Sequence, residues 1–189
     1  MISKDGGASG WLGALTALGA LAPATVIAAD YLSVEEAQRA LFPQADRFAE
    51  VALSLRPEQH AQVAALAGGQ PPHRSLRVFQ AFAGVELLGY VFIDEVVGKE
   101  DFITYAASID SAGSLGPLEV LSYRESHGGE IRNGSWRRQF AGRRDLGQLR
   151  VQTDIKNIAG ATLSCEHVTQ GVRWLVALWQ VALRPPKAG

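Results

Sequence analysis

Thr162 and Ser164 place two hydroxyl groups at the expected beginning of an apolar helix. They lie in NIAGATLSCEHVTQGVRWLVAL, residues 157–178, and follow the small residues Gly160 and Ala161. One capping side chain is enough to begin a helix, so a single Thr or Ser here is the ordinary N-cap. The first amides of a helix also attract anions, because they lack backbone partners and lie at the positive end of the helix dipole. The stretch therefore predicts a helix start and offers a place for a phosphate, held near the chain or bonded to it.

A second polar segment, ESHGGE, follows a predicted strand at residues 125–130. The residues of interest in it are Glu125, Ser126, His127, Gly128 and Gly129. Adjacent glycines let backbone amides approach a flat or anionic ligand closely. Alone, the segment is equally well read as a turn, and His127 as a surface histidine. Together with the hydroxyl-bearing helix start, it indicates a binding site.

These two segments make the sequence resemble the FMN-binding domain family. That family includes the covalent-FMN subunits of the sodium-pumping NADH:quinone reductase and of the Rnf complex, together with smaller exported proteins. The resemblance covers roughly residues 77–178. Its main motif, a Ser/Thr-Gly-Ala-Thr stretch at a helix start, is matched by AGATLS at 159–164, and the upstream motif by ESHGGE. The order and spacing of GYVFIDEVVGKEDFITYAASID, followed by a strand ending in YRES, are also similar.

The resemblance implies FMN as the cofactor and a site around the two motifs. In this family a flavin transferase, which uses FAD and magnesium, joins FMN to the Thr of Gly-Ala-Thr through a phosphoester bond. Carried over, the acceptor is Thr162, and Leu163 and Ser164 adjoin it. The small Gly160 and Ala161 are expected to leave room for the ribityl chain, and residues 125–129 to lie near the isoalloxazine ring or that chain.

Two positions depart from the family's flavinylation pattern. Lys156 stands six residues before Thr162, where the pattern has Asp, and Ala159 stands directly before Gly160, where it has Ser or Thr. The departures concern covalent attachment more than flavin binding, and they leave reversible binding as the alternative. Lys156 could itself contact the phosphate as a point charge.

Composition narrows the class of protein. The chain has 189 residues, of which 47% are hydrophobic and 20% charged, which is typical of a globular protein. Its 18 Lys and Arg residues do not outnumber its 19 Asp and Glu residues, so we expect no nucleic-acid partner. The single cysteine, Cys165, excludes a disulfide within the chain and a multi-cysteine metal site, and we expect no metal.

The N-terminus predicts export. Residues 11–29 carry no charge, and cleavage after Ala28 would leave Val26 and Ala28 at the two selective positions of a signal peptide. The run is also just long enough for an uncleaved membrane anchor, and a buried helix of the mature domain is the further alternative. We therefore expect an extracytoplasmic location, on the periplasmic side. The expected organisation is an export signal or anchor over 1–29, a helical lead-in over 30–72 and the FMN-binding domain over 73–185.

Hydrophobic periodicity predicts an α+β fold, with a twisted, largely antiparallel sheet, flanking helices and a long C-terminal helix. Two early helices are expected, one from the capping-box spacing of Ser33 and Glu36 and ending at Pro43, the other beginning at Pro57.

Runs rich in β-branched and aromatic residues then predict strands over 50–55, 76–82, 87–97, 103–110 and 118–125. Residues 128–144 are expected to form a loop with one helical turn around Trp136, and 149–155 an edge strand or extended segment. The last helix should span about 163–183, with a core-facing stripe of Val168, Val172, Leu175, Trp179 and Ala182.

Other candidates for chemistry are weaker. Cys165 is expected to be a packed residue rather than an activated thiol, and His167 to lie on a solvated face. The arginine pairs 137–138 and 143–144 are expected to form a solvated basic edge, and Trp174 to belong to the core or a partner surface.

The function expected from these features is that of an extracytoplasmic electron carrier. Such a protein would have a membrane-bound or soluble redox partner and the flavin transferase as its second partner. The alternatives are a flavin-dependent reductase of a small substrate, which would make the chain an enzyme, and a non-redox binding domain that has lost flavin.

Overall fold

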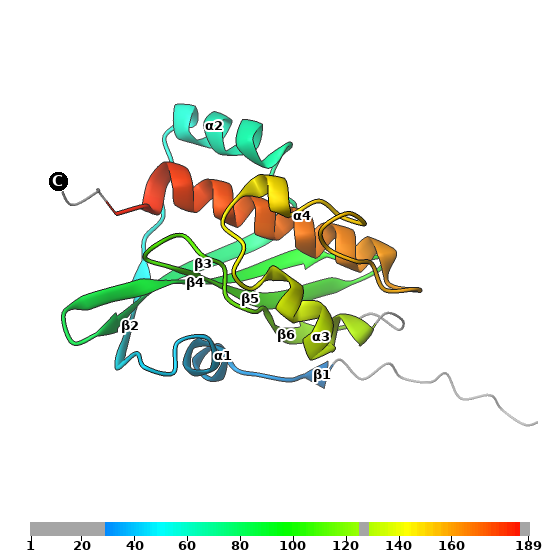
Figure 1. Cartoon of the computed structure of the whole chain (residues 1–189), viewed down its shortest axis with the longest axis horizontal. Coiled ribbons are helices and arrows are strands. Elements are labelled where there is room, and N and C mark those ends of the chain that lie inside the picture. Colours follow the sequence, from blue (N-terminus) through cyan, green and yellow to red (C-terminus); the bar gives the residue numbers. More distant parts are fainter. Residues whose placement is uncertain (1–28, 125–128, 186–189) are drawn as a thin grey trace, which may run out of the picture.

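The computed structural model describes residues 29–124 and 129–185. Within them, six strands form one sheet in the order β1-β6-β5-β4-β3-β2, and every neighbouring pair is antiparallel (Figure 1). The strands are β1 (Ala29–Asp30), β2 (Arg47–Val51), β3 (His73–Ala83), β4 (Glu86–Val97), β5 (Phe102–Asp110) and β6 (Glu119–Tyr123). The fold is therefore α+β, as the sequence predicts, although β2 begins and ends earlier than the expected strand over 50–55.

The early helices begin where the sequence places their caps. Helix α1 (Val34–Leu41) has a complete capping box, in which the Ser33 hydroxyl accepts from the amide of Glu36 and the Glu36 carboxylate accepts from that of Ser33. Helix α2 (Pro57–Ala67) has Pro57 in its first turn and ends at Gly68, which has the left-handed φ of +85° that suits a C-cap glycine.

The helices cover both faces of the sheet. Helix α1 packs on one face, against a small core that includes Phe79, Val91 and Ile93. Helix α4 (Thr162–Leu178), continued by the π-helical turn η4 (Trp179–Leu183), packs on the other face with α2 beside it (Figure 1). Alternation of side chains along β4 sends Phe92 and Val96 toward α4.

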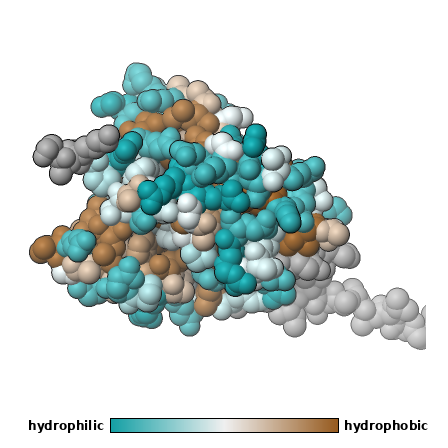
Figure 2. All heavy atoms as spheres, in the orientation of Figure 1, coloured by the Kyte–Doolittle hydropathy of each residue, from teal (hydrophilic) through white to brown (hydrophobic). Residues whose placement is uncertain are grey.

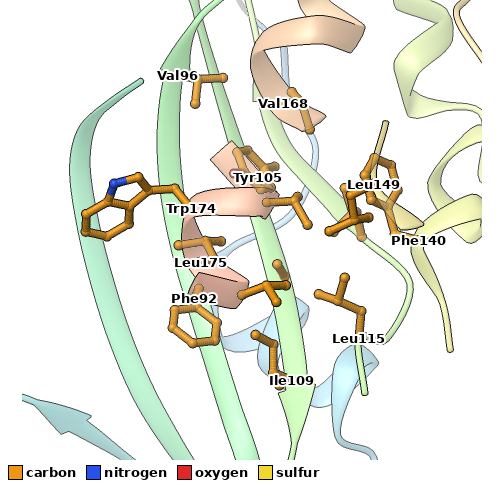
Figure 3. Close-up of a cluster of buried hydrophobic side chains, with 14 of the residues drawn as sticks. Phe92, Val96, Tyr105, Ile109, Leu115, Phe140, Leu149, Val168, Trp174 and Leu175 are labelled. Atoms are coloured by element: carbon orange, nitrogen blue, oxygen red, sulfur yellow. The ribbon is translucent and has the colours of Figure 1, made fainter. Parts of the chain in front are cut away.

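The larger core lies under α4. It contains the predicted stripe residues Val168, Val172, Leu175 and Trp179, all buried. Figure 3 shows Trp174 on one side of this core and Phe140 and Leu149 on the other, with Tyr105 and Leu175 between them.

Residues 129–160 form a layer of short turns beside α4 rather than strands. They contain η1 (Gly129–Arg132), α3 (Gly134–Arg137), η2 (Arg138–Phe140) and η3 (Leu146–Gln148). The helical turn expected around Trp136 is confirmed as α3. Hydrophilic residues cover much of the middle of the molecular face drawn in Figure 2.

The expected edge strand or extended segment over 149–155 is wrong, because these residues form a turn. The Asp154 carboxylate accepts hydrogen bonds from the backbone amide and Nε of Arg150, and the amides of Asp154 and Ile155 donate back to the Arg150 carbonyl. Gln152 completes the turn with a positive φ of 66°. Side-chain-to-backbone bonding of this kind competes with strand pairing, and the alternation of Val151 and Ile155 gave no sign of it.

In the parts of the chain that the structure describes, no helix combines the length and apolar character needed to cross a membrane. The apolar run over 11–28 lies outside the described residues.

Candidate functional site

A tight turn sets the direction in which the last helix begins. The amide of Ala161 donates to the carbonyl of Ile158 at 3.0 Å, and Gly160, at the third position of this turn, has φ +84°. A type II turn requires a positive φ at that position, which only glycine adopts without strain. A Cβ on Gly160 would meet nothing within 4 Å, so the glycine is required by its dihedral angle and not by crowding.

Helix α4 begins without a side-chain cap. Its N-cap is Ala161, and no side chain accepts a hydrogen bond there. The first amide with a helical acceptor is that of Cys165, which donates to the Ala161 carbonyl at 2.9 Å. The amides of Thr162, Leu163 and Ser164 precede the first helical acceptor and have no partner within the helix. An uncapped helix start of this kind binds anions.

The two hydroxyl-bearing residues differ in exposure. Thr162 is the first residue of α4 and is exposed, and Leu163 beside it is 43% exposed. Ser164 is only 3% exposed, and Ala161, also 3% exposed, belongs to the core. The hydroxyl accessible to a large molecule is therefore that of Thr162, and the methyl group of Ala161 faces the core rather than a ligand.

A cavity of about 520 Å³ opens next to this turn. It lies between α3 and the segment that leads to α4, and it is lined by Asn133, Ser135, Trp136, Gln139, Lys156, Asn157 and Ile158. This volume lies within the range of small-molecule and cofactor sites. Ile158 is thus both a wall of the cavity and the acceptor of the turn that begins α4.

The walls of the cavity are fixed by hydrogen bonds to the backbone of Lys156. The indole Nε1 of Trp136 donates to the Lys156 carbonyl at 2.8 Å, and the Lys156 amide donates to Oε1 of Gln139 at 2.9 Å. Trp136 is buried and packs edge-on against Phe140, with ring centroids 5.2 Å apart. The main chain of Lys156 is therefore held from α3 and η2, while its side chain is exposed.

Asn157 supplies a polar group that the protein itself leaves unpaired. Its side-chain oxygen Oδ1 is buried and has no hydrogen-bond partner. A buried acceptor without a partner is costly, and it gains most from a ligand that carries a donor. The cavity thus combines an aromatic wall, an unpaired acceptor and a neighbouring cation, which fits a planar heterocycle with N–H groups and a phosphate tail such as FMN.

The arginine pairs do not form the expected solvated edge. The guanidinium of Arg143 donates from Nε to the Gln139 carbonyl at 2.5 Å, from Nη1 to the Gln148 carbonyl at 2.7 Å and from Nη2 to the Asp154 carbonyl at 2.8 Å. Arg143 thus holds together the loops that surround the cavity.

The first pair is also only partly solvated. Arg137 donates to the carbonyl of Leu118 and pairs with Glu119, and its side chain is only 19% exposed. Arg138 and Arg144 remain exposed.

The start of α4 is also joined to the turn between β4 and β5. Nδ1 of His167 lies 2.6 Å from the carbonyl of Val97, so His167 is half-buried rather than on the expected solvated face. Cys165 is fully buried, and burial raises the pKa of its thiol. It is therefore a packed residue, as predicted, and not an activated nucleophile.

The second predicted motif cannot be placed against this site. Glu125, Ser126, His127 and Gly128 lie outside the described residues, and Gly129 begins η1. The sequence also gave no prediction for Asn157, Gln139 or the cavity as a whole. Of the residues that line the cavity, Trp136 was the one that the sequence placed in a helical turn.

Comparison with known proteins agrees with this geometry. No curated protein matches the chain. Residues 98–177, from the turn after β4 through α4, match the family model described as FMN-binding domain. That segment includes the turn, the uncapped helix start and every residue that lines the cavity. The match supports an FMN-binding domain over residues 98–177, with FMN as its cofactor.

Proposed function

We propose that this chain is an extracytoplasmic electron-transfer flavoprotein in which FMN is joined to Thr162 by a phosphoester bond. One observation carries the proposal: the exposed Thr162 stands at the uncapped start of α4, beside a cavity of cofactor size. Phosphoryl transfer to a hydroxyl depends mainly on positioning and on neutralising charge, and this helix start supplies both.

The phosphate end of the site would be held by the backbone. The amides of Thr162, Leu163 and Ser164 are free to donate to phosphate oxygens at the positive end of the helix dipole. The exposed side chain of Lys156 provides a cation at the rim of the cavity. In this proposal a lysine takes the place of the aspartate of the flavinylation pattern and acts as a point charge for the bound diester.

The ring end of the site would occupy the cavity. Trp136 and Ile158 offer apolar surface, and Oδ1 of Asn157 offers a buried acceptor for a ring N–H group. When bound, FMN supplies the one- and two-electron chemistry that side chains lack, and the protein supplies its position. The sequence contains no nicotinamide-binding fingerprint, so we infer that electrons come from another redox protein.

Electron transfer is tested by reducing the purified flavoprotein and offering it acceptors. A carrier exchanges electrons with a membrane fraction or a redox protein and turns over no small substrate by itself. Sustained turnover of a small organic acceptor without any partner protein would show the alternative, a reductase. Absence of a flavin spectrum in protein from the native host would show the other alternative, a binding domain without flavin.

The extracytoplasmic location rests on the uncharged run over 11–29 and on the small residues at 26 and 28. Fractionation of the native host should place the domain on the outer side of the cytoplasmic membrane, either cleaved or anchored. A full-length chain found only in the cytosol, with Met1 retained, would contradict export.

A further inference from the structure

Beneath the middle of α4 lies a cluster of buried polar side chains that the flavin site does not use. Asp94 of β4 and Tyr105 of β5 are both completely buried, and the side chain of His73, at the start of β3, is 16% exposed. The Tyr105 hydroxyl donates to Oδ2 of Asp94 at 2.6 Å. That bond satisfies only one of the two carboxyl oxygens.

The other carboxyl oxygen faces an imidazole nitrogen that is also unpaired. Oδ1 of Asp94 lies 3.9 Å from Nδ1 of His73, and neither atom has a hydrogen-bond partner. This distance is too long for a direct hydrogen bond. The two atoms face each other across this gap without a bond. Trp174 closes this side of the cluster, with its ring edge-on to His73 at a centroid distance of 4.6 Å.

The backbone of α4 seals the cluster from above. A Cβ on Gly171 would lie 2.3 Å from the Tyr105 hydroxyl oxygen and 3.0 Å from Oδ2 of Asp94. Glycine is therefore required at this position because the helix rests directly on the Asp94–Tyr105 pair. The carboxyl group is separated from solvent by the helix that begins at Thr162.

Two arrangements of one shared proton are possible for Asp94 and His73. In the first, a carboxylate faces an imidazolium, and both charges are buried without the close contact that would offset their desolvation. In the second, a protonated carboxyl faces a neutral imidazole, and no charge is buried. The absence of a hydrogen bond between Oδ1 and Nδ1, in a site sealed by Gly171 and Trp174, favours the second.

We propose that Asp94 and His73 form a buried proton-binding site, in which the pair holds one proton on the carboxyl group of Asp94 beneath helix α4. Among the residues that the structure describes, no cation acts on Asp94, and a positive charge on His60 opposes a positive charge on His73. From α2 comes His60, from β4 Glu95 and from β5 Tyr105, while α4 contributes the uncharged Gly171 and Trp174.

The pKa shifts of the two groups agree with this assignment. Burial raises the pKa of Asp94 from 3.8 to about 7, against the lowering effect of the Tyr105 hydrogen bond. Burial, with a smaller effect of His60, lowers the pKa of His73 from 6.5 to about 4. Between about pH 4 and 6.5, folding moves one proton from the imidazole of His73 to the carboxyl group of Asp94 and leaves the number of bound protons unchanged. As the pH rises through about 7 the proton leaves, and a negative charge arises under α4.

The first test is nitrogen NMR of the histidine rings in the full chain at about pH 5.5. This pH lies between the ordinary pKa of histidine, 6.5, and the pKa of about 4 that burial gives His73. The His73 signals are assigned by their loss in His73→Phe, which keeps a ring against Trp174. We expect the pattern of a neutral imidazole. An imidazolium pattern for His73 at this pH would mean an ion pair and would overturn the proposal.

The second test compares the pH dependence of unfolding in Asp94→Asn and His73→Phe with that of the unaltered chain. Removing Asp94 removes a contribution that weakens the fold as pH rises, so relative stability should increase between about pH 4 and 7. Removing His73 removes the opposite contribution, so relative stability should decrease between about pH 4 and 6.5. Each slope approaches a tenfold change of the unfolding equilibrium constant per pH unit.

The double variant Asp94→Asn/His73→Phe is the matched control. The difference between its unfolding free energy and that of the unaltered chain should hardly change with pH between about pH 4 and 6.5. An ion pair would lower the pKa of Asp94 and raise that of His73. The stability differences of the two single variants would then change with pH below about pH 4 for Asp94→Asn and above about pH 6.5 for His73→Phe. Relative slopes confined to those outer ranges, or no relative slopes at all, would overturn the proposal.

Discussion

The carbonyl oxygen of Ile158 accepts a hydrogen bond from the amide of Ala161 at 3.0 Å, and this bond joins the cavity beside α3 to the helix that begins at Thr162. Because Ile158 lines the cavity and Ala161 is the N-cap of α4, the distance between the cavity wall and the Thr162 hydroxyl is fixed by a single turn.

The turn is tested by Gly160→Ala. The new methyl group would have free space, but the left-handed φ of +84° would cost about 1 kcal/mol in an L-residue. We expect a loss of stability of this size and a lower flavin content, because the strained turn no longer fixes Thr162. Urea unfolding and the flavin-to-protein absorbance ratio measure both.

Gly147→Ala is the control for this change. A Cβ there also meets nothing within 4 Å, and Gly147 has no left-handed φ. It should leave flavin content unchanged. Equal flavin loss in both variants would show that the dihedral angle of Gly160 is not what matters.

The helices and most strands could be predicted from sequence because their signals are local. Ser33 and Glu36 form the capping box that their spacing predicts, and Pro57 begins a helix. Most of the core stripe of α4 follows from periodicity, because a helix face depends only on spacing. The sequence singled out Gly160 for the room that it leaves a ligand, and the structure adds that its positive φ requires glycine.

The rest depended on side-chain contacts that hydrophobic periodicity does not reveal. The misplaced strand over 149–155 is folded back by Asp154, whose bond to the Arg150 amide competes with extended backbone. Arg143 reads as a surface charge in the sequence, yet it ties three backbone carbonyls. The approach of His73 to Asp94 likewise depends on the register of β3 and β4, which sets His73 opposite Val96, two residues from Asp94.

The loop around the cavity is tested by Arg143→Lys. A lysine keeps the charge but cannot reach three carbonyls with a planar fork, so the carbonyls of Gln139 and Asp154, which are partly buried, lose their donors. We expect a loss of about 2 kcal/mol in unfolding free energy. Flavin binding should weaken with it, because the same loops shape the cavity.

The neighbouring arginine provides a matched comparison. Arg144 is exposed, and Arg144→Lys should change the unfolding free energy by less than about 0.5 kcal/mol. If the two substitutions destabilise the protein equally, the three bonds of Arg143 do not organise the loop.

The unpaired amide is tested by Asn157→Leu in apoprotein prepared without the flavin transferase. Leucine removes the buried acceptor Oδ1, so the apoprotein should keep or gain stability, whereas FMN binding should weaken by about 1 kcal/mol. Fluorescence titration with free FMN and thermal unfolding measure the two effects. Unchanged FMN affinity would mean that the ring does not bind to Asn157.

The same cavity offers a comparison at Asn133. Its side-chain oxygen is already bonded to the amide and hydroxyl of Ser135, so it has less to offer a ligand. Asn133→Ala should therefore destabilise α3 through loss of a cap, by about 1 kcal/mol, in the apoprotein and the flavin-bound protein alike.

The most direct measurement is the flavin that remains on acid-precipitated, denatured protein after expression in a host with the flavin transferase. The unaltered chain should stay yellow and carry the added mass of FMN in an intact mass spectrum, and a host without the transferase should yield the unmodified mass. Thr162→Ala and Thr162→Val should both be colourless, since the chemistry needs the oxygen, whereas Ser164→Ala should keep its flavin because Ser164 is buried. Release of all FMN from the unaltered chain on denaturation would contradict covalent attachment at Thr162 and leave this domain as a reversible flavin binder.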